Sequence, residues 1–254
     1  MISIQLRFYE ELNDFLPPEK RKTQFIHTVS QKTSIKEVIE SLGIPHTEIE
    51  VILVNGISVD FNYLVQDRDF ISVYPVFEAF DVSEIIRLHP KPLRKPRFIL
   101  DVHLGKLAKY LRLLGFDVVY ANNLTDKFII QCSVNEHRIV LTRDIGILKN
   151  KSITHGHWMH HTNPQQQVDE VLQQFQLKKQ CNPLTRCLSC NGRLKKIEKK
   201  KIVADIPELT QKYYQTFMQC QSCKKIYWEG SHYTKLKNWI ESILGDSEDE
   251  SFKK

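Results

Sequence analysis

Three aspartates stand at positions where carboxylates could hold a metal ion. Asp101 ends the apolar run FILD, Asp144 ends the run IVLTRD, and Asp126 lies between them, after a strand-like run with its loop and ahead of a helical pattern. In an open parallel sheet, reactive groups collect outside the carboxyl ends of the strands. Three carboxylates converging on one edge repel one another unless a cation lies between them. The pattern predicts a divalent-metal site, although Asp101 taken alone fits a helix N-cap better than a ligand.

Four cysteines give a second metal-binding pattern. Cys187 and Cys190 form one pair with two residues between them, and Cys220 and Cys223 form another. This spacing lets two such pairs surround one tetrahedral Zn²⁺. A redox Cys-x-x-Cys is the alternative, but two pairs so close together favour a four-cysteine zinc site. Such a site has no open coordination position, so we expect its role to be structural.

Two further cysteines fall outside these pairs. Cys132 lies in the helical pattern after Asp126, and Cys181 lies just before the first zinc pair. We expect both to be free thiols, with Cys132 buried.

The elements that would position Asp101 can be read from the residues that follow it. Apolar residues recur at helical spacing and end at a glycine that fits the C′ position. The residues on this face are Leu104, Leu107, Ala108, Leu111 and Leu114. Lys106, Lys109 and Arg112 are expected on the opposite, polar face. Residues 118–120 read as the next strand, so strand, helix and strand open a βαβ unit.

After Asp144 the chain carries a histidine-rich segment and then a helix. Residues 153–161 hold four histidines, and we expect a strand with partly solvated imidazoles rather than metal ligands. Asn163 followed by Pro164 is typical of a helix start, with Asn as N-cap and Pro at the first helical position.

The first third of the sequence has the pattern of a small domain of its own. Strict alternation over residues 2–8 predicts a half-buried strand, and further strands are expected over 23–29, 51–54 and 69–77. Ser34 with Glu37 forms a capping box before a helix. Strands and one helix in this order resemble a β-grasp, ubiquitin-like domain.

Within that domain, the run VILVNG is similar to the sulfur carriers of thiamine and molybdopterin synthesis. Those carriers end in a free Gly-Gly, whereas this chain continues through Glu78-Ala79-Phe80. Sulfur-transfer chemistry is therefore not expected. We interpret the domain as a docking module for a protein partner.

The runs FILDVHLGKLAKYLRLLGFDVVY, LTD and RIVLTRD resemble the Mut-seven C-terminal RNase family, a branch of the PIN-fold nucleases with a zinc ribbon. The resemblance covers about residues 97–244. It implies that Asp101, Asp126 and Asp144 bind Mg²⁺ or Mn²⁺ and cut RNA. Asp117 also matches a family aspartate but precedes its strand, so we interpret it as structural.

The sequence departs from that family in one respect. Family members often carry a further acid just after the TRD motif, whereas Ile145-Gly146-Ile147 follows here. Tight binding of a second metal is therefore not expected. The departure also keeps open a different class of function, a non-catalytic RNA- or ribosome-binding protein with a degenerate pocket.

Composition places the positive charge away from the first third of the 254 residues. Residues 1–96 hold 11 basic and 14 acidic residues, a net −3, whereas 97–180 are +4 (11 against 7) and 181–254 are +5 (14 against 9). This asymmetry suits a polyanionic partner such as RNA. No long uncharged apolar stretch or signal peptide is apparent, so we expect a cytoplasmic protein without a membrane partner.

Side chains that could contact RNA lie mostly in the last part of the chain. Lysines crowd the region between the zinc pairs, and such a run is usually a solvated face. Near a nuclease pocket it could instead follow phosphates. Aromatic residues 227–233 could stack on bases or could pack the ribbon. The candidate substrate-binding residues are Arg143, Lys199, Lys200, Lys201, Ser231 and His232.

These inferences give a multidomain α+β and α/β plan. We expect a ubiquitin-like β-grasp domain at 1–80, a proline-rich linker at 81–96, and a PIN-like RNase domain with a parallel sheet at 97–180. A zinc ribbon with a C-terminal helix follows at 181–244, and 245–254 have the composition of a disordered tail. The predicted function is hydrolysis of RNA phosphodiester bonds by a divalent-metal-dependent ribonuclease.

Overall fold

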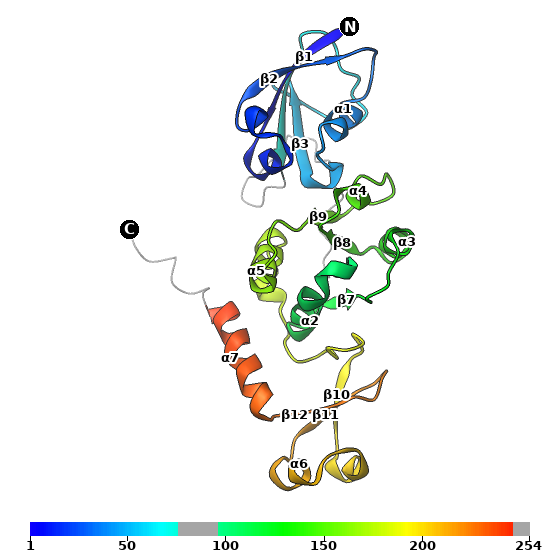
Figure 1. Cartoon of the computed structure of the whole chain (residues 1–254), viewed down its shortest axis with the longest axis vertical. Coiled ribbons are helices and arrows are strands. Elements are labelled where there is room, and N and C mark those ends of the chain that lie inside the picture. The colour runs from blue at the N-terminus through cyan, green and yellow to red at the C-terminus, as the bar shows by residue number, and fades with distance from the viewer. Residues whose placement is uncertain (76–95, 246–254) are drawn as a thin grey trace, which may run out of the picture. The chain divides into compact units, whose positions relative to one another are not determined.

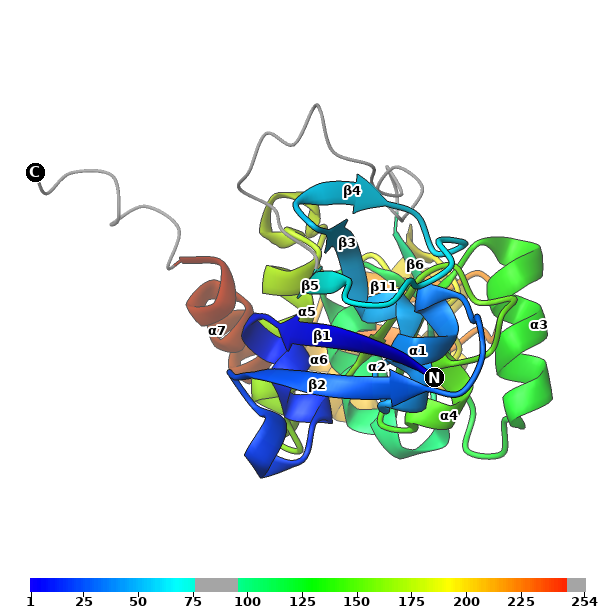
Figure 2. The ribbon, with the colours of Figure 1, turned by 90° about the horizontal axis from the view of Figure 1, so that it is seen from above.

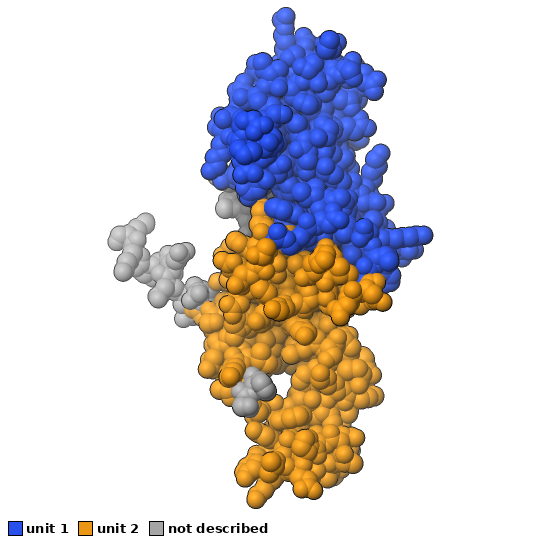
Figure 3. Space-filling view, in the orientation of Figure 1, with its two compact units in different colours: residues 1–95, 124–158 blue, residues 96–123, 159–254 orange. Residues whose placement is uncertain are grey.

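The computed structural model describes residues 1–75 and 96–245 (Figure 1). The predicted linker therefore lies almost entirely outside the described residues, and the predicted tail lies outside them except for its first residue. The chain divides into two compact units, coloured separately in Figure 3: residues 1–95 with 124–158, and residues 96–123 with 159–254. Each is described below by itself.

The first unit opens with a five-stranded mixed sheet in the order β2-β1-β5-β3-β4. Its elements are β1 (Ile2–Phe8), β2 (Gln24–Val29), α1 (Ile35–Ser41), β3 (Ile49–Val54), β4 (Ile57–Val59) and β5 (Phe70–Pro75). Strand β1 pairs antiparallel with β2 and parallel with the central strand β5, and β1 and β2 lie side by side in Figure 2. This arrangement confirms the β-grasp prediction. Residues 76 and 77 of the predicted last strand lie outside the described part.

Local sequence signals account for these elements. The side chains of Ile4, Leu6 and Phe8 are buried while their neighbours on β1 are exposed or half-buried. Ser34 Oγ accepts the N–H of Glu37 at 3.3 Å and so caps α1. Gly56 has a φ of 83°, which suits the tight turn between β3 and β4.

The first unit continues with α3 (Asp126–Glu136), β8 (Ile139–Thr142), α4 (Ile145–Leu148) and β9 (Gly156–Trp158). β8 and β9 run parallel. The strand expected over residues 153–161 is shorter than predicted, and His157 in it is only 3% exposed. The expectation of partly solvated imidazoles is therefore wrong for His157.

Within this unit, the ubiquitin-like domain contacts β9 through a buried carboxylate on the 3₁₀ turn His46–Glu48, which precedes β3. Glu48, which is 3% exposed, accepts the N–H of Trp158 at 2.6 Å, and its other oxygen lies 3.3 Å from His157 Nδ1. His46 Nε2 lies 2.9 Å from the carbonyl oxygen of Ile153, and the Phe15 and Trp158 rings are 5.1 Å apart. These contacts attach the ubiquitin-like domain to the segment that carries β8 and β9.

The second unit begins with β6 (Arg97–Leu100), the short 3₁₀ turn η4 (Val102–Leu104), α2 (Gly105–Leu113) and β7 (Asp117–Val119). β6 and β7 are parallel neighbours, as the βαβ pattern predicts. Gly115, with a φ of 96°, ends α2. The N–H of Phe116 reaches the carbonyl of Leu111, and the N–H of Gly115 reaches that of Arg112, which together make a Schellman cap.

Helix α5 (Pro164–Gln174) follows in the same unit and packs against α2. Asn163 Oδ1 accepts the N–H of Gln165, so the predicted N-cap is confirmed. Phe98 of β6 contacts both Phe116 and Phe175 at ring distances near 6 Å (5.9 and 6.0 Å). These contacts join the strand to the cap of α2 and the end of α5.

The last part of the second unit is a three-stranded antiparallel ribbon in the order β10-β11-β12. Its elements are β10 (Leu194–Ile197), α6 (Glu208–Tyr213), β11 (Phe217–Cys220) and β12 (Ile226–Trp228), followed by α7 (Ser231–Gly245). Ile202, Ile206 and Phe217 form its small buried core. The Trp239 ring of α7 lies 4.6 Å from the Tyr110 ring of α2. In the described ranges, no helix is both long and apolar enough to cross a membrane.

Candidate functional site

The four paired cysteines come together in one cluster. Cys187, Cys190, Cys220 and Cys223 place their sulfurs within 4.8 Å of one another. Cys187 Sγ lies 3.6 Å from Cys223 Sγ, and Cys190 Sγ lies 3.4 Å from Cys220 Sγ. Four convergent thiols are the donor set that structural zinc takes, so the cluster could hold a Zn²⁺ ion.

Both cysteine pairs are held by the same backbone turn. The residue after the second cysteine has a positive φ in each: 68° at Asn191 and 63° at Lys224. In each turn its N–H reaches back to the carbonyl of the first cysteine, at 2.9 and 3.1 Å. A Cβ at Gly192 would stand 2.8 Å from Cys220 Sγ, so glycine lets one turn approach the opposite sulfur.

The cysteines of the cluster differ in the direction in which their pKa values are shifted. Burial raises the pKa of Cys187, but hydrogen bonds from Tyr227 and from backbone N–H groups outweigh burial and lower that pKa to about 6. The N–H of Lys225 lowers the pKa of Cys223, but hydrogen bonds to the neighbouring sulfurs raise it to about 12. Four thiolates at this spacing need a cation between them.

Tyr227 supports the cluster from beside it. Its hydroxyl lies 3.1 Å from Cys187 Sγ and accepts the N–H of Leu188 at 3.2 Å. Burial, together with the neighbouring Cys187 thiolate, raises the pKa of Tyr227. Trp228 packs against the ribbon core. Stacking on bases and packing of the ribbon were both expected for these aromatic residues. The contacts described for Tyr227 and Trp228 are those of packing.

Arg112 joins the cluster to the α2–β7 layer. Its guanidinium donates to the carbonyls of Leu188 and Ser189, at 3.1 and 3.0 Å, and to that of Val118, at 3.1 Å from Nε and 2.9 Å from Nη2. The residue is 4% exposed, and burial lowers its pKa. The expectation that Arg112 lies on a polar face is wrong, because the first cysteine turn covers that face of α2.

Asp117 has the structural role that its place in the sequence indicated. Its Oδ2 lies 3.1 Å from Arg186 Nη2, and its Oδ1 accepts from Asn191 Nδ2 at 2.8 Å. Asn191 Oδ1 in turn accepts the N–H of Val118 at 3.0 Å. Asp117 therefore anchors the ribbon rather than a catalytic metal. Sequence reasoning missed the roles of Arg112, Arg186 and Asn191, since the partners through which they join the ribbon to the α2–β7 layer are more than 60 positions away.

Asp101 lies in the second unit, where β6 ends. Its side chain is buried, at 6% exposure, and its carbonyl accepts the N–H of Leu104. The carboxylate makes no capping hydrogen bond to the following turn, although Asp101 occupies the N-cap position. Asp101 therefore has the N-cap position that the alternative predicted, but its side chain does not make the capping hydrogen bond.

The other two aspartates belong to the first unit. Asp126 is the first residue of α3 and is exposed, and Thr125 rather than Asp126 caps that helix by accepting the N–H of Phe128. Asp144 is exposed and uses Oδ1 to accept the N–H of Gly146 at 2.7 Å, so it caps α4. The other carboxylate oxygen of Asp144, Oδ2, takes no part in this cap.

The turn that carries Arg143 and Asp144 is fixed from two sides. Thr142 Oγ1 accepts the N–H of Asp144 at 2.9 Å, and the Trp158 indole donates to the carbonyl of Arg143 at 3.1 Å. Arg143 itself is exposed. The turn therefore presents its charged side chains from a rigid backbone.

The predicted RNA-contacting lysines lie on the short 3₁₀ turn Lys199–Lys201 of the ribbon. Lys200 Nζ lies 2.9 Å from Glu198, Lys201 Nζ lies 3.7 Å from it, and Lys199 donates to Gln215. Part of their charge is therefore already paired locally. Ser231 begins α7, and the side chains of Ser231 and His232 lie outside the described part of the structure.

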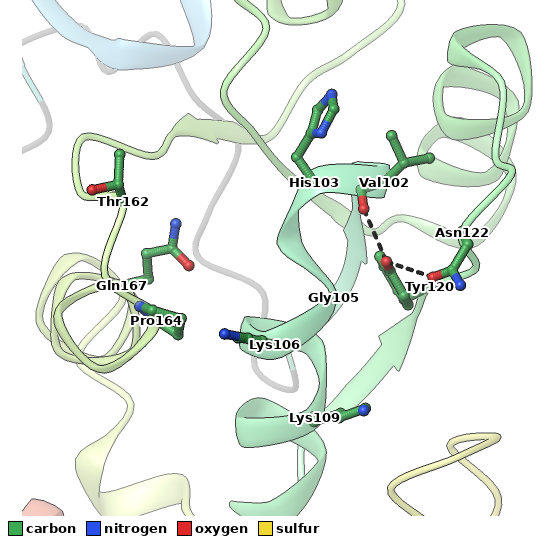
Figure 4. Close-up of a pocket in the computed structure, with 10 residues that line it drawn as sticks. All are labelled: Val102, His103, Gly105, Lys106, Lys109, Tyr120, Asn122, Thr162, Pro164 and Gln167. Carbon is green, nitrogen blue, oxygen red and sulfur yellow. Dashed lines mark hydrogen bonds between the residues drawn. The ribbon is translucent and has the colours of Figure 1, made fainter.

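A cleft of about 430 Å³ in the second unit was not predicted (Figure 4). Lys106 and Lys109 of α2 line it, together with Tyr120 after β7 and Gln167 of α5. The helical spacing of the two lysines was the part of this cleft that the sequence could indicate, because it places both on the polar face of α2. The other walls could not be predicted, because Tyr120 and Gln167 are distant from the lysines along the chain.

Comparisons with known proteins agree with this architecture. A family profile described as the Mut7-C RNAse domain matches residues 96–240, and one described as Mut7-C ubiquitin matches residues 1–81. The chain is 27% identical over 135 residues to an uncharacterised protein of Caenorhabditis elegans, ZK1098.3. That match spans 50% of this chain and 17% of the worm protein. No solved structure matches the chain.

The family match covers more than half of the chain and includes β6, α2, the parallel pairs β6–β7 and β8–β9, and the four-cysteine cluster. The ubiquitin-like match precedes it in the order that the sequence predicted. The chain therefore belongs to the Mut7-C RNAse domain family.

Proposed function

We propose that this protein is a divalent-metal-dependent ribonuclease that hydrolyses RNA phosphodiester bonds. Family membership supports a nuclease and an RNA substrate. The observation that carries the finer proposal is the position of Asp101, whose side chain is buried directly after the parallel strand β6. In open parallel sheets, reactive groups collect outside the carboxyl ends of the strands.

In this proposal Asp101, Asp126 and Asp144 supply carboxylate oxygens to Mg²⁺ or Mn²⁺. Oxygen ligands of this kind are those that such hard cations prefer. A bound ion would lower the pKa of a water molecule and stabilise the charge that develops on the phosphate oxygens.

The roles of the chain's own residues follow from their surroundings. Thr142 and Trp158 hold the Asp144 turn, and one oxygen of Asp144 remains for a metal while the other caps α4. Exposed Arg143, on the same turn, would place its positive charge near a bound phosphate. The Zn²⁺ that we propose for the cysteine cluster is structural, because its four ligands leave no open position.

A second function, RNA or ribosome binding without catalysis, is favoured by one observation. The position after the Asp144 turn carries Ile145-Gly146-Ile147 instead of an acid, and Asp144 has a structural role as a cap. The protein partner proposed for the ubiquitin-like domain fits either function.

Cleavage of labelled single-stranded and hairpin RNAs with Mn²⁺, Mg²⁺ or EDTA separates the two functions. We expect cleavage that needs the metal and disappears in Asp101→Asn, which removes the charge and keeps the shape. The matched control is Asp14→Asn, at an exposed position of the ubiquitin-like domain. Metal-independent cleavage, or full activity of Asp101→Asn, would refute the metal-dependent mechanism. RNA binding without cleavage in any metal would favour the second function.

A further inference from the structure

The cleft beside α2 combines a positive wall with an aromatic one. Lys106 and Lys109 stand three residues apart on α2, so their side chains lie on one face of the helix. His103, in the turn before the helix, adds a third nitrogen-bearing side chain. None of the described residues that line this cleft is a carboxylate, so the described walls offer an anionic ligand only neutral or positive groups.

The two ammonium groups are available to a ligand. Both lysines are exposed, and within the described residues neither forms an ion pair with a carboxylate. Lys200 and Lys201 of the ribbon differ, because both have Glu198 as a partner. A phosphate at Lys106 and Lys109 would therefore not have to displace an existing ion pair.

Tyr120 is held in a fixed position beside α2, as Figure 4 shows. Its hydroxyl donates to the carbonyl of Val102 at 2.9 Å and lies 2.8 Å from Asn122 Oδ1. A Cβ at Gly105 would stand 2.5 Å from the Tyr120 hydroxyl, so only glycine lets the ring lie against α2. Fixed aromatic rings beside cationic groups are typical of surfaces that bind single-stranded nucleic acid.

The start of α5 completes the cleft. Figure 4 shows Lys106 extending from α2 toward Pro164 and Gln167. The amino end of this 11-residue helix carries partial positive charge, which adds to that of the lysines. Thus two elements contribute positive potential to one concave surface.

The cleft also lies next in sequence to the proposed metal ligand. Val102 and His103, which line it, directly follow the buried Asp101. We propose that this cleft binds the phosphodiester backbone of the RNA substrate, with Lys106 and Lys109 contacting consecutive phosphates. This inference rests on the proposed ribonuclease function and adds to it the surface that holds the strand beside Asp101.

The test measures binding under conditions that do not require cleavage. A fluorescent single-stranded RNA of about 12 nucleotides, within the usual span of single-strand sites, is titrated in Ca²⁺ with the parent, with Lys106→Gln/Lys109→Gln, and with the control Lys22→Gln/Lys32→Gln. The control changes charge equally, at exposed lysines of the ubiquitin-like domain. We expect the cleft variant to flatten the slope of log affinity against log salt by about 1.4, or about 0.7 for each phosphate on single strands.

Glutamine keeps helix propensity, and Lys106→Arg/Lys109→Arg should restore the slope because it restores the charge. An unchanged slope in the glutamine variant, or an equal loss in the control, would overturn the cleft proposal. A parent that binds no RNA would overturn it as well. Cleavage by the parent in Mn²⁺ is a separate readout: if the cleft variant loses binding but the parent never cuts, the cleft proposal stands and the ribonuclease proposal fails.

Discussion

The carbonyl oxygen of Ser189, which lies between Cys187 and Cys190 in the first cysteine turn, accepts a 3.0 Å hydrogen bond from the guanidinium of Arg112 on α2. The same guanidinium donates to Val118 of β7. One buried side chain therefore connects the backbone of a cysteine turn to the α2–β7 layer. Loss of the metal and loss of the layer's packing should be coupled through it.

Arg112→Lys should destabilise the protein although it keeps the charge. A lysine cannot reproduce the planar fork, so several buried carbonyls lose their donor. We expect a loss on the order of 3 kcal/mol in the free energy of unfolding, together with faster release of zinc to a chelator. Thermal denaturation and chelator kinetics measure the two effects. The exposed control Lys179→Arg should change neither, and a stable Arg112→Lys protein that holds zinc normally would contradict the coupling.

The cysteine cluster should contain about one Zn²⁺ per chain. Metal analysis of protein purified without oxygen measures this directly. Cys187→Ser should lose the metal and unfold the ribbon, because the folding of small zinc modules depends on the ion. Cys132→Ser, at a buried cysteine outside the cluster, is the control and should keep the zinc. Zinc-free parent protein that keeps a folded ribbon would show that the cluster is not a zinc site.

Several parts of the fold could be predicted because their signals are local. Alternation along β1, the Asn55-Gly56 turn and the glycine that ends α2 each depend on a few neighbouring residues. The cysteine pairs were equally clear, since each pair needs only one short turn. Such signals specify an element or a ligand set without any knowledge of the rest of the fold.

The parts that could not be predicted depend on distant contacts. Arg112 has the spacing of a solvent-facing residue on α2, yet the turn that buries it lies 76 positions later. His157 lies in a histidine-rich segment, yet Glu48 of the ubiquitin-like domain covers it. The identity of a residue does not reveal which layer will pack over it. The same limit hid the α2 cleft, whose walls come from three segments.

Glu48→Ala should weaken the attachment of the ubiquitin-like domain to β9. The change leaves the buried N–H of Trp158 without its acceptor and His157 without its carboxylate. We expect a loss of about 1–3 kcal/mol in unfolding free energy. Hydrogen exchange at the Trp158 amide should accelerate about tenfold or more. Glu19→Ala, at an exposed position, is the control, and unchanged exchange at Trp158 in the Glu48 variant would argue against this contact in solution.

Asp144 offers a way to separate catalysis from helix capping. Asparagine caps helices as well as aspartate does, so Asp144→Asn should keep the stability of the α4 turn. It removes a negative charge from the proposed metal site, and cleavage should fall roughly 100-fold or more. Asp144→Ala should lose the same activity and about 1 kcal/mol of stability in addition. If Asp144→Asn cuts RNA as fast as the parent, the carboxylate serves only as a cap.

The lysine turn of the ribbon gives a contrasting prediction, because Glu198 competes there with any phosphate. Lys200 and Lys201 are paired with Glu198, and hydrogen bonding to Lys200 together with the charge of Lys201 lowers the pKa of the Glu198 carboxyl. Replacing all three lysines of Lys199–Lys201 by glutamine should flatten the salt slope of RNA binding by about 0.7 for each phosphate that the turn no longer neutralises.

Glu198→Gln should act in the opposite direction. It frees two ammonium groups for phosphates, so RNA affinity at low salt should rise and the salt slope should steepen. Because phosphate binding carries no base information, both effects should be the same for RNAs of different sequence. Glu208→Gln, an exposed acid in the first turn of α6, controls for the change in net charge. Equal effects of the two glutamine variants, or an unchanged slope in the triple lysine variant, would mean that this turn is a solvated face.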